Sequence, residues 1–155
     1  MRKLLVALAC VVTTAAVVVG QDITTLESIG PVASVQKTEN TVTFSCRDKS
    51  QVQLTILAPD LVRVRAAFRT QIPAKDHSWA IAKDDWTTPR WTLSETSGAV
   101  IVSTGELEVV VRRAPLLIEF RDARTHQLIN ADERPMAYDA NGKLEPGVTV
   151  LRIVI

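Results

Sequence analysis

The residues that could carry catalytic chemistry are few and widely separated in this 155-residue chain. Its two histidines, His77 and His126, have no second ligand at the spacing of an HxH or HExxH metal motif. No serine lies in the GxSxG setting of an activated nucleophile, and no glycine-rich loop could cradle a phosphate group. We therefore expect no bound metal and no cofactor.

Acidic residues are more numerous, but they do not form a recognisable pair. Hydrolysis of a glycosidic bond uses two carboxylates that flank the bond. Asp84 and Asp85 are adjacent, and neighbouring residues on a strand point to opposite faces, so they are poorly placed for this role. The remaining candidates are explained as turn formers or surface charges: Glu106, Glu108, Asp122, Asp132 and Glu133. We expect no catalytic residue in this chain.

All three tryptophans, Trp79, Trp86 and Trp91, fall in residues 70–92, a long stretch without clear periodicity. An aromatic ring at the rim of a sheet can stack on a sugar, because it offers flat apolar area with a polar handle. A tryptophan in a long loop can equally pack that loop onto the sheet. For Trp79 packing is the favoured interpretation. For Trp86 and Trp91 both interpretations stay open, and these two are the candidate carbohydrate-binding residues.

The N-terminus has the layout of a secretory signal peptide. Arg2 and Lys3 precede an apolar run over residues 4–19, and small residues follow before Gln21. The run is shorter than the roughly 20 residues of a membrane-spanning helix. We expect residues 1–20 to be removed on export to the periplasm or the cell exterior, which leaves no membrane contact. The alternative is an uncleaved membrane anchor. After cleavage, Cys46 would be the only cysteine left, and it shares a face with Val42 and Phe44, which predicts a buried, inert thiol.

Charge excludes one class of partner. The 18 Lys+Arg residues are balanced by 17 Asp+Glu residues, whereas a nucleic-acid surface gathers basic residues on one face. The arginines have apolar or acidic neighbours, and we expect them to line solvated strand faces: Arg63, Arg65, Arg112, Arg113, Arg121 and Arg124.

The elements that must position these residues are strands. Apolar residues take the even positions from 52 to 56 and again from 62 to 66, with a turn at Pro59-Asp60. Similar short segments cover residues 32–37, 41–46, 99–103, 107–112 and 116–120, while residues 131–147 look irregular. Many short strands at spacings near ten residues indicate an all-β antiparallel sandwich over residues 32–155, preceded by a linker at 21–31.

The last segment, residues 148–155, is apolar on both faces and ends without a polar tail. Such a strand requires burial on both faces. We interpret this as a polypeptide that continued beyond Ile155. The alternative is a central strand that ends the domain.

Three motifs in order resemble the N-terminal domain of glycoside hydrolase family 31, the α-glucosidase and α-xylosidase family. A D-x-[VI]-R-[VI] run is matched by Asp60, Val62, Arg63 and Val64, and a P…SWAV-like stretch by Pro73 and residues 78–81. A T-x-x-L-x-V-x-V…P…I-x-F-x-D hairpin is matched by Thr104, Leu107, Val109, Val111, Pro115, Ile118, Phe120 and Asp122. The resemblance covers roughly residues 32–132. One departure is the turn after Asp122, where the family usually has glycine and this chain has Thr125 and His126.

The resemblance implies a galactose-mutarotase-like β-sandwich that packs against a catalytic (β/α)8 barrel and shapes its substrate entrance. The family's catalytic aspartates lie in that barrel, so no catalytic residue is carried over to this chain. Its partners would be the barrel and an α-linked oligosaccharide. Two alternatives remain: a free-standing carbohydrate-binding module using Trp86 and Trp91, and a surface interaction sandwich without a sugar role.

Overall fold

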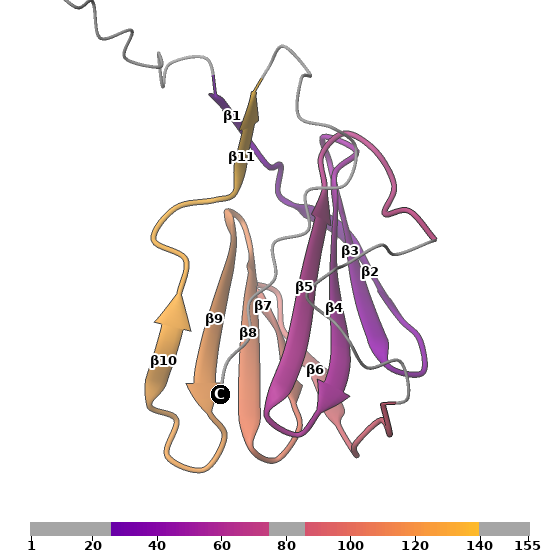
Figure 1. Cartoon of the computed structure of the whole chain (residues 1–155). Helices are drawn as coiled ribbons and strands as arrows, with labels where there is room; N and C mark the ends of the chain where they lie inside the picture. The colour runs from indigo at the N-terminus through magenta and orange to yellow at the C-terminus, as the bar shows by residue number, and fades with distance from the viewer. Residues whose placement is uncertain (1–25, 75–85, 140–155) are drawn as a thin grey trace, which may run out of the picture.

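The computed structural model describes residues 26–74 and 86–139, which form eleven strands and no helix (Figure 1). The smaller sheet has the order β2-β3-β4-β5: Val32–Lys37, Thr41–Cys46, Gln51–Ala58 and Leu61–Ala67. The larger sheet has the order β10-β9-β8-β7-β6: Leu128–Ala131, Leu116–Asp122, Leu107–Arg113, Ala99–Ser103 and Thr92–Glu95. A two-stranded ribbon pairs β1 (Leu26–Ser28) with β11 (Ala137–Asp139). All pairs are antiparallel, so the predicted antiparallel β-sandwich is confirmed.

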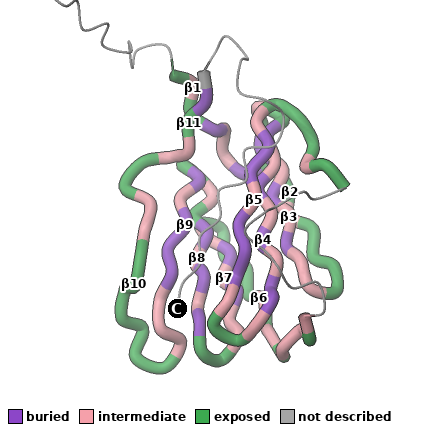
Figure 2. Tube along the Cα trace, viewed as in Figure 1, coloured by how far each residue is buried: buried purple, intermediate pink, exposed green. Residues whose placement is uncertain are grey.

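The core lies between the four-stranded and the five-stranded sheet and is built from alternate residues of their longer strands (Figure 2). Phe44 and Leu54 are fully buried from the smaller sheet, and Val109 and Phe120 from the larger one. These side chains belong to a single hydrophobic cluster. The period of two in the sequence therefore marks the core face correctly, because successive side chains of a strand point to opposite faces.

Tight turns join neighbouring strands in each sheet. Pro59-Asp60 connects β4 to β5, as predicted, with Ala58 paired to Leu61 across the turn. Gly105 lies between β7 and β8 with a φ of +91°, a backbone conformation that residues other than glycine rarely adopt. Within each of the two sheets, strands that are consecutive in the chain are therefore neighbours in space.

The outer face of the smaller sheet differs from the expectation. Arg63 points away from the core as predicted, but it is only 8% exposed, so the prediction of a solvated side chain is wrong for this residue. Its register partner Thr55 is half-buried as well. The outer face around β4 and β5 is therefore partly covered. On the larger sheet, Arg112 and Arg124 have well-exposed side chains, as expected.

Three short strands were not predicted: β1, β6 and β11. Several predictions fall outside the described residues, namely the signal peptide, the apolar segment 148–155, and the residues His77, Trp79, Asp84 and Asp85. Within residues 26–74 and 86–139, no helix is long and apolar enough to cross a membrane.

Candidate functional site

Trp91, one of the two candidate sugar-binding residues, lies just before β6 and is half-buried against the core. Its indole N–H donates to the backbone oxygen of Glu39 at 3.2 Å. The Nζ atom of Lys37 lies 4.1 Å from the ring centroid, so a cation covers part of the ring. These contacts hold the segment before β6 against the smaller sheet. Trp86, the other candidate, is half-buried.

A hollow of about 560 Å³ lies beside Trp91. Its lining combines one aromatic ring with polar groups: Arg90, Trp91, Thr92, Ser103, Thr104 and Gly105. The Thr104 hydroxyl is already engaged, because it accepts from the N–H of Leu107 at 3.0 Å and also contacts the backbone oxygen of Pro59. The hollow has room for a small polar ligand, with Arg90 and the hydroxyls of Thr92 and Ser103 as the remaining polar partners.

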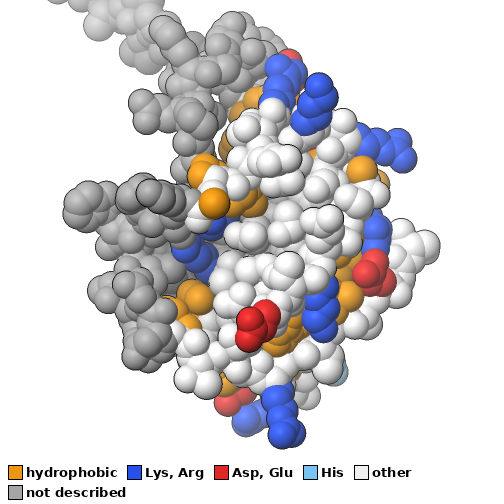
Figure 3. Space-filling view, turned by 90° about the vertical axis from the view of Figure 1, so that its right-hand side faces the viewer, with side chains coloured by type: hydrophobic (Ala, Val, Ile, Leu, Met, Phe, Trp, Pro, Cys, Tyr) orange, Lys and Arg blue, Asp and Glu red, His pale blue; other side chains and the backbone are white. Residues whose placement is uncertain are grey.

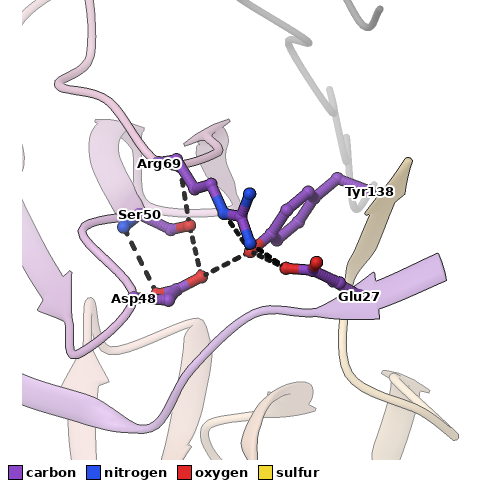
Figure 4. Close-up of polar contacts among 5 residues, drawn as sticks. All are labelled: Glu27, Asp48, Ser50, Arg69 and Tyr138. Atoms are coloured by element: carbon purple, nitrogen blue, oxygen red, sulfur yellow. Dashed lines mark hydrogen bonds and ion pairs between the residues drawn. The ribbon is translucent and has the colours of Figure 1, made fainter. Parts of the chain in front are cut away.

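A second group of polar residues gathers at the opposite end of the smaller sheet (Figure 4). We call Glu27, Asp48, Ser50, Arg69 and Tyr138 the Arg69 cluster. Its members come from β1, from the turn between β3 and β4, from the segment after β5, and from β11. Arg69 has a φ of +52°, and its guanidinium points toward Tyr138 and Glu27.

Arg69 links all parts of this cluster. Its backbone N–H donates to Ser50 Oγ at 2.9 Å, and its Nε donates to Tyr138 Oη at 3.1 Å. Its Nη2 forms an ion pair with Glu27. The guanidinium also lies 5.3 Å from the centroid of the Tyr138 ring. One side chain therefore connects both strands of the ribbon to the end of the smaller sheet.

Asp48 fixes the other side of the cluster. Its Oδ2 accepts from the hydroxyl of Ser50 at 2.6 Å, and Ser50 is fully buried. Burial raises the pKa of Asp48, but hydrogen bonds from the Ser50 hydroxyl and from the backbone N–H groups of Gly30 and Ser50 outweigh it, so the pKa lies below its ordinary value. Asp48 is thus held as a carboxylate that organises the turn.

A third polar group occupies the outer face of the larger sheet. Glu119 on β9 is 7% exposed and accepts hydrogen bonds from Arg112 and Arg121, each at 2.6 Å. The bond from Arg121, together with that from Arg112, holds the pKa of Glu119 below its usual range in spite of burial. A buried carboxylate with an arginine bound to each oxygen is a structural anchor of the strand face.

Cys46 is 5% exposed, as predicted for a structural thiol. Burial, and secondarily the negative charge of Asp48, raise its pKa to about 12. Such a thiol is a poor nucleophile, because the thiolate is the reactive form. Among the described residues, no group of three or more His, Cys, Asp or Glu side chains could hold a metal ion.

Comparison with family models decides the identity of the fold. Residues 51–149 match the model of the glycosyl hydrolase 31 N-terminal galactose mutarotase-like domain. The chain belongs to this family. The resemblance inferred from the three motifs is therefore confirmed, and the match spans the smaller sheet's β4 and β5 and the whole of the larger sheet.

Solved structures of glycoside hydrolase 31 proteins share this fold. A dextranase of Flavobacterium johnsoniae, determined with isomaltotriose, is 22% identical with a TM-score of 0.62. A cycloalternan-forming enzyme of Listeria monocytogenes, determined with a pentasaccharide substrate, is 17% identical with a TM-score of 0.54. The matches cover 70% and 69% of this chain, but only 13% and 10% of those proteins. None of the curated proteins compared with this chain matches it.

The turn after Asp122, which has Thr125 and His126 where the family usually has glycine, is held by hydrogen bonds to the Asp122 side chain. In the turn after β9, Oδ1 of Asp122 accepts hydrogen bonds from the N–H groups of Arg124 and Thr125, at 2.9 and 2.7 Å. His126 follows with a φ of +57°, the left-handed conformation that favours glycine. His126 therefore takes up the left-handed position of this turn. His126 is well exposed, with its Nδ1 atom 3.7 Å from Glu108.

The Arg69 cluster was not predicted from the sequence. Arg69 is 42 residues from Glu27 and 69 residues from Tyr138. Of its parts, only Asp48 and Ser50 lie close together in the sequence, in the turn between β3 and β4. The pairing of the remaining members depends on the tertiary fold.

Proposed function

We propose that this domain is a non-catalytic N-terminal β-sandwich of an exported α-glycosidase-like protein of carbohydrate metabolism. In that role it packs against a catalytic (β/α)8 barrel and helps to shape the substrate entrance. The observation that carries the proposal is the family match over residues 51–149. In the solved relatives, the corresponding region is a minor part of a much longer enzyme.

The occupied carboxylates support a non-catalytic role. Glu119 is bound by two arginines, Asp48 by the Ser50 hydroxyl, and Asp122 by backbone N–H groups. Each of these groups has its pKa lowered by such bonds, whereas the general acid of a glycosidase needs a raised pKa. Among the described residues, the best-ordered acidic groups therefore hold turns and strands together.

Two measurements test the proposal. The first is release of glucose from isomaltotriose and maltose by the purified chain, where we expect no turnover above a buffer blank. Measurable hydrolysis would contradict the non-catalytic role. The second is sequencing of the coding DNA beyond codon 155. An open frame encoding a barrel with paired aspartates supports the proposal, and a stop codon followed by unrelated sequence contradicts it.

Export is tested separately. The chain is expressed from its first codon in a secreting host, and the mass of the exported product is measured. Cleavage before Gln21 is the expected result. Retention of residues 1–20 in a cytoplasmic product would contradict the export part of the proposal alone.

A second candidate function is carbohydrate binding by the sandwich itself. The hollow beside Trp91 favours it, because an indole and hydroxyl groups line one concave surface. The test is a calorimetric titration with isomaltotriose, using Trp91→Ala and Trp86→Ala as variants. Binding abolished by either substitution supports this function. Absence of binding at millimolar sugar, with a monodisperse chain, leaves the surface interaction sandwich as the alternative.

A further inference from the structure

The β1–β11 ribbon is set apart from the two larger sheets. It projects at one end of the molecule, beyond the ends of both sheets (Figure 1). Each of its strands has three residues, and they pair only with each other. An isolated two-stranded pair is marginally stable in water, so this ribbon requires anchors on the sandwich.

Its apolar anchors are few. Ile29, directly after β1, and Tyr138 on β11 are buried at 4% and 5% exposure, whereas Leu26 is 47% exposed. The Tyr138 ring packs on Phe68 with a centroid distance of 5.1 Å. The N–H of Ile29 donates to the backbone oxygen of Met136 at 2.8 Å and joins the two chain segments below the ribbon. Ile29 belongs to the core cluster and Met136 packs against it, so the apolar anchoring lies at the base of the ribbon and, through the Tyr138 ring, on β11.

The polar anchors converge on Arg69. Its Nε–Tyr138 bond reaches β11, its ion pair with Glu27 reaches β1, and its backbone N–H is bonded to the buried Ser50. Tyr138 Oη also lies 3.2 Å from Glu27 and 3.4 Å from Asp48. Loss of Arg69 or of the Tyr138 hydroxyl would leave the ribbon attached mainly through the Ile29 segment and the Tyr138 ring.

Figure 3 shows the space-filling surface of one side of the molecule, on which white, non-ionic surface predominates and the charged side chains are scattered. In the Arg69 cluster, in contrast, Arg69 forms an ion pair with Glu27, and the Tyr138 hydroxyl links this pair to Asp48 at 3.4 Å. An element with few buried apolar contacts is typical of a region that opens locally, and the polar contacts of the Arg69 cluster oppose that opening.

We propose that the β1–β11 ribbon is a clamp that Arg69 and Tyr138 hold closed on the end of the sandwich. The clamp opens as one unit while both sheets stay folded. Asp139 ends β11, so the closed clamp fixes the position of this end of the ribbon on the sandwich. If a catalytic barrel packs against the domain, a point that rests on the proposed function, Arg69 is a positioning residue for its docking.

The test is amide hydrogen exchange of the full chain, which requires no barrel and no substrate. The reporters are the N–H of Ile29 and the amides of β1 and β11, compared with those of Phe44 and Val52 in the core. The variants are Tyr138→Phe, which keeps the ring, and Arg69→Gln, which removes the ion pair. Arg124→Gln is the matched control, because it removes an arginine from an exposed pair with Glu106 at 3.9 Å.

In the wild-type chain we expect the ribbon amides to exchange faster than the core amides, because local opening requires less free energy than unfolding. Tyr138→Phe and Arg69→Gln are each expected to speed ribbon exchange by about tenfold, the effect of losing a well-made hydrogen bond. Exchange at Phe44 and Val52 should stay within about twofold of wild type, as should all amides of Arg124→Gln.

Two results would overturn the clamp. One is exchange of ribbon and core amides at a common rate in every variant, since the ribbon would then open only with the whole domain. The other is unchanged ribbon exchange in both variants. Either result would leave the non-catalytic role untouched, because that role is tested by hydrolysis and by the coding DNA.

Discussion

Replacement of Glu119 by glutamine is the sharpest test of how the outer face of the larger sheet is stabilised. A buried charge-assisted hydrogen bond contributes about 1.5–3 kcal/mol, and a surface ion pair about 0.2–1 kcal/mol. The side chain of Arg112 is 57% exposed, so its bond belongs to the weaker class, and that of Arg121 is 36% exposed and lies between the two. Since glutamine keeps one carbonyl oxygen, we expect a loss of about 2 kcal/mol at pH 7.

The assays are urea unfolding, which gives the free energy, and thermal unfolding, which gives the melting temperature, of Glu119→Gln beside the wild-type chain, repeated from pH 7 down to pH 3. At about 4 °C per kcal/mol for a domain of this size, the melting temperature should fall by about 8 °C. Glu106→Gln is the control. It makes the same chemical change in a side chain that is 53% exposed and 3.9 Å from Arg124, and it should cost less than about 0.5 kcal/mol.

The pH dependence gives an independent check. The pKa of Glu119 is lowered from 4.5 in the folded chain, so the unfolded chain binds this proton more readily. The stability from Glu119 is therefore complete above pH 4.5 and is lost as the pH falls through the lowered value. Glutamine does not titrate, so the difference between variant and wild type should narrow below pH 4.5. A loss below about 0.5 kcal/mol at pH 7, or a difference that does not change with pH, would refute this reasoning.

Three further changes test other parts of the domain. His126→Gly removes the cost of a left-handed backbone, about 1–2 kcal/mol, but adds about 0.5–1 kcal/mol of chain entropy lost by glycine on folding. Urea unfolding should therefore show that the free energy of unfolding rises by about 0.5 kcal/mol, and a decrease would contradict the turn geometry. Gly30→Ala places a methyl group 2.9 Å from Oδ1 of Asp48 and 3.0 Å from the backbone nitrogen of Asp48. Thermal unfolding should show a loss of stability of about 1–3 kcal/mol, and unchanged stability would mean that the turn at Asp48 moves to make room for the methyl group. Iodoacetamide at pH 8 should alkylate Cys46 only after the chain is unfolded in urea, because at a pKa of about 12 only about one Cys46 thiol in ten thousand is ionised. Rapid labelling of Cys46 in the folded chain would contradict its burial.

The longer strands could be predicted from the sequence because each carries its own signal. The alternation of apolar residues from Val52 to Ile56 and from Val62 to Ala66 identified β4 and β5 and the face that each buries. The three missed strands, β1, β6 and β11, have three or four residues each. A segment of that length shows too few repeats to establish a period of two. Two of them also pair with each other from distant parts of the chain.

The period of two did not predict which residues on the outer faces of the sheets are buried. Alternation correctly placed Arg63 opposite the core, and Arg63 is nevertheless buried at 8% exposure. Glu119, for which no prediction was made, also lies opposite the core and is 7% exposed. A period of two distinguishes one face of a sheet from the other, but it does not say what lies over the second face. For Glu119 the cover includes Arg112 and Arg121 from the same sheet, whose approach depends on strand register.

The candidate sites show the same limit. Trp91 was identified by its residue type alone, and only the fold revealed that Lys37 and Glu39 from the other sheet contact its ring and its N–H. Tyr138 and Glu27, 111 residues apart, have no relation in the sequence that could be read before the fold was known. A site assembled from segments so far apart is a property of topology.

The ribbon also determines an order of events during synthesis. Within each of the larger sheets, every strand pairs with its neighbour along the chain, so each hairpin can close as soon as its second strand is made. β1 is the exception, because its partner β11 is translated roughly 110 residues later, about 6–22 seconds at 5–20 residues per second. During that interval the first strand of the domain has no partner, and it is the last to be paired. The ribosome thus completes the sandwich before the two ends of the domain can be joined.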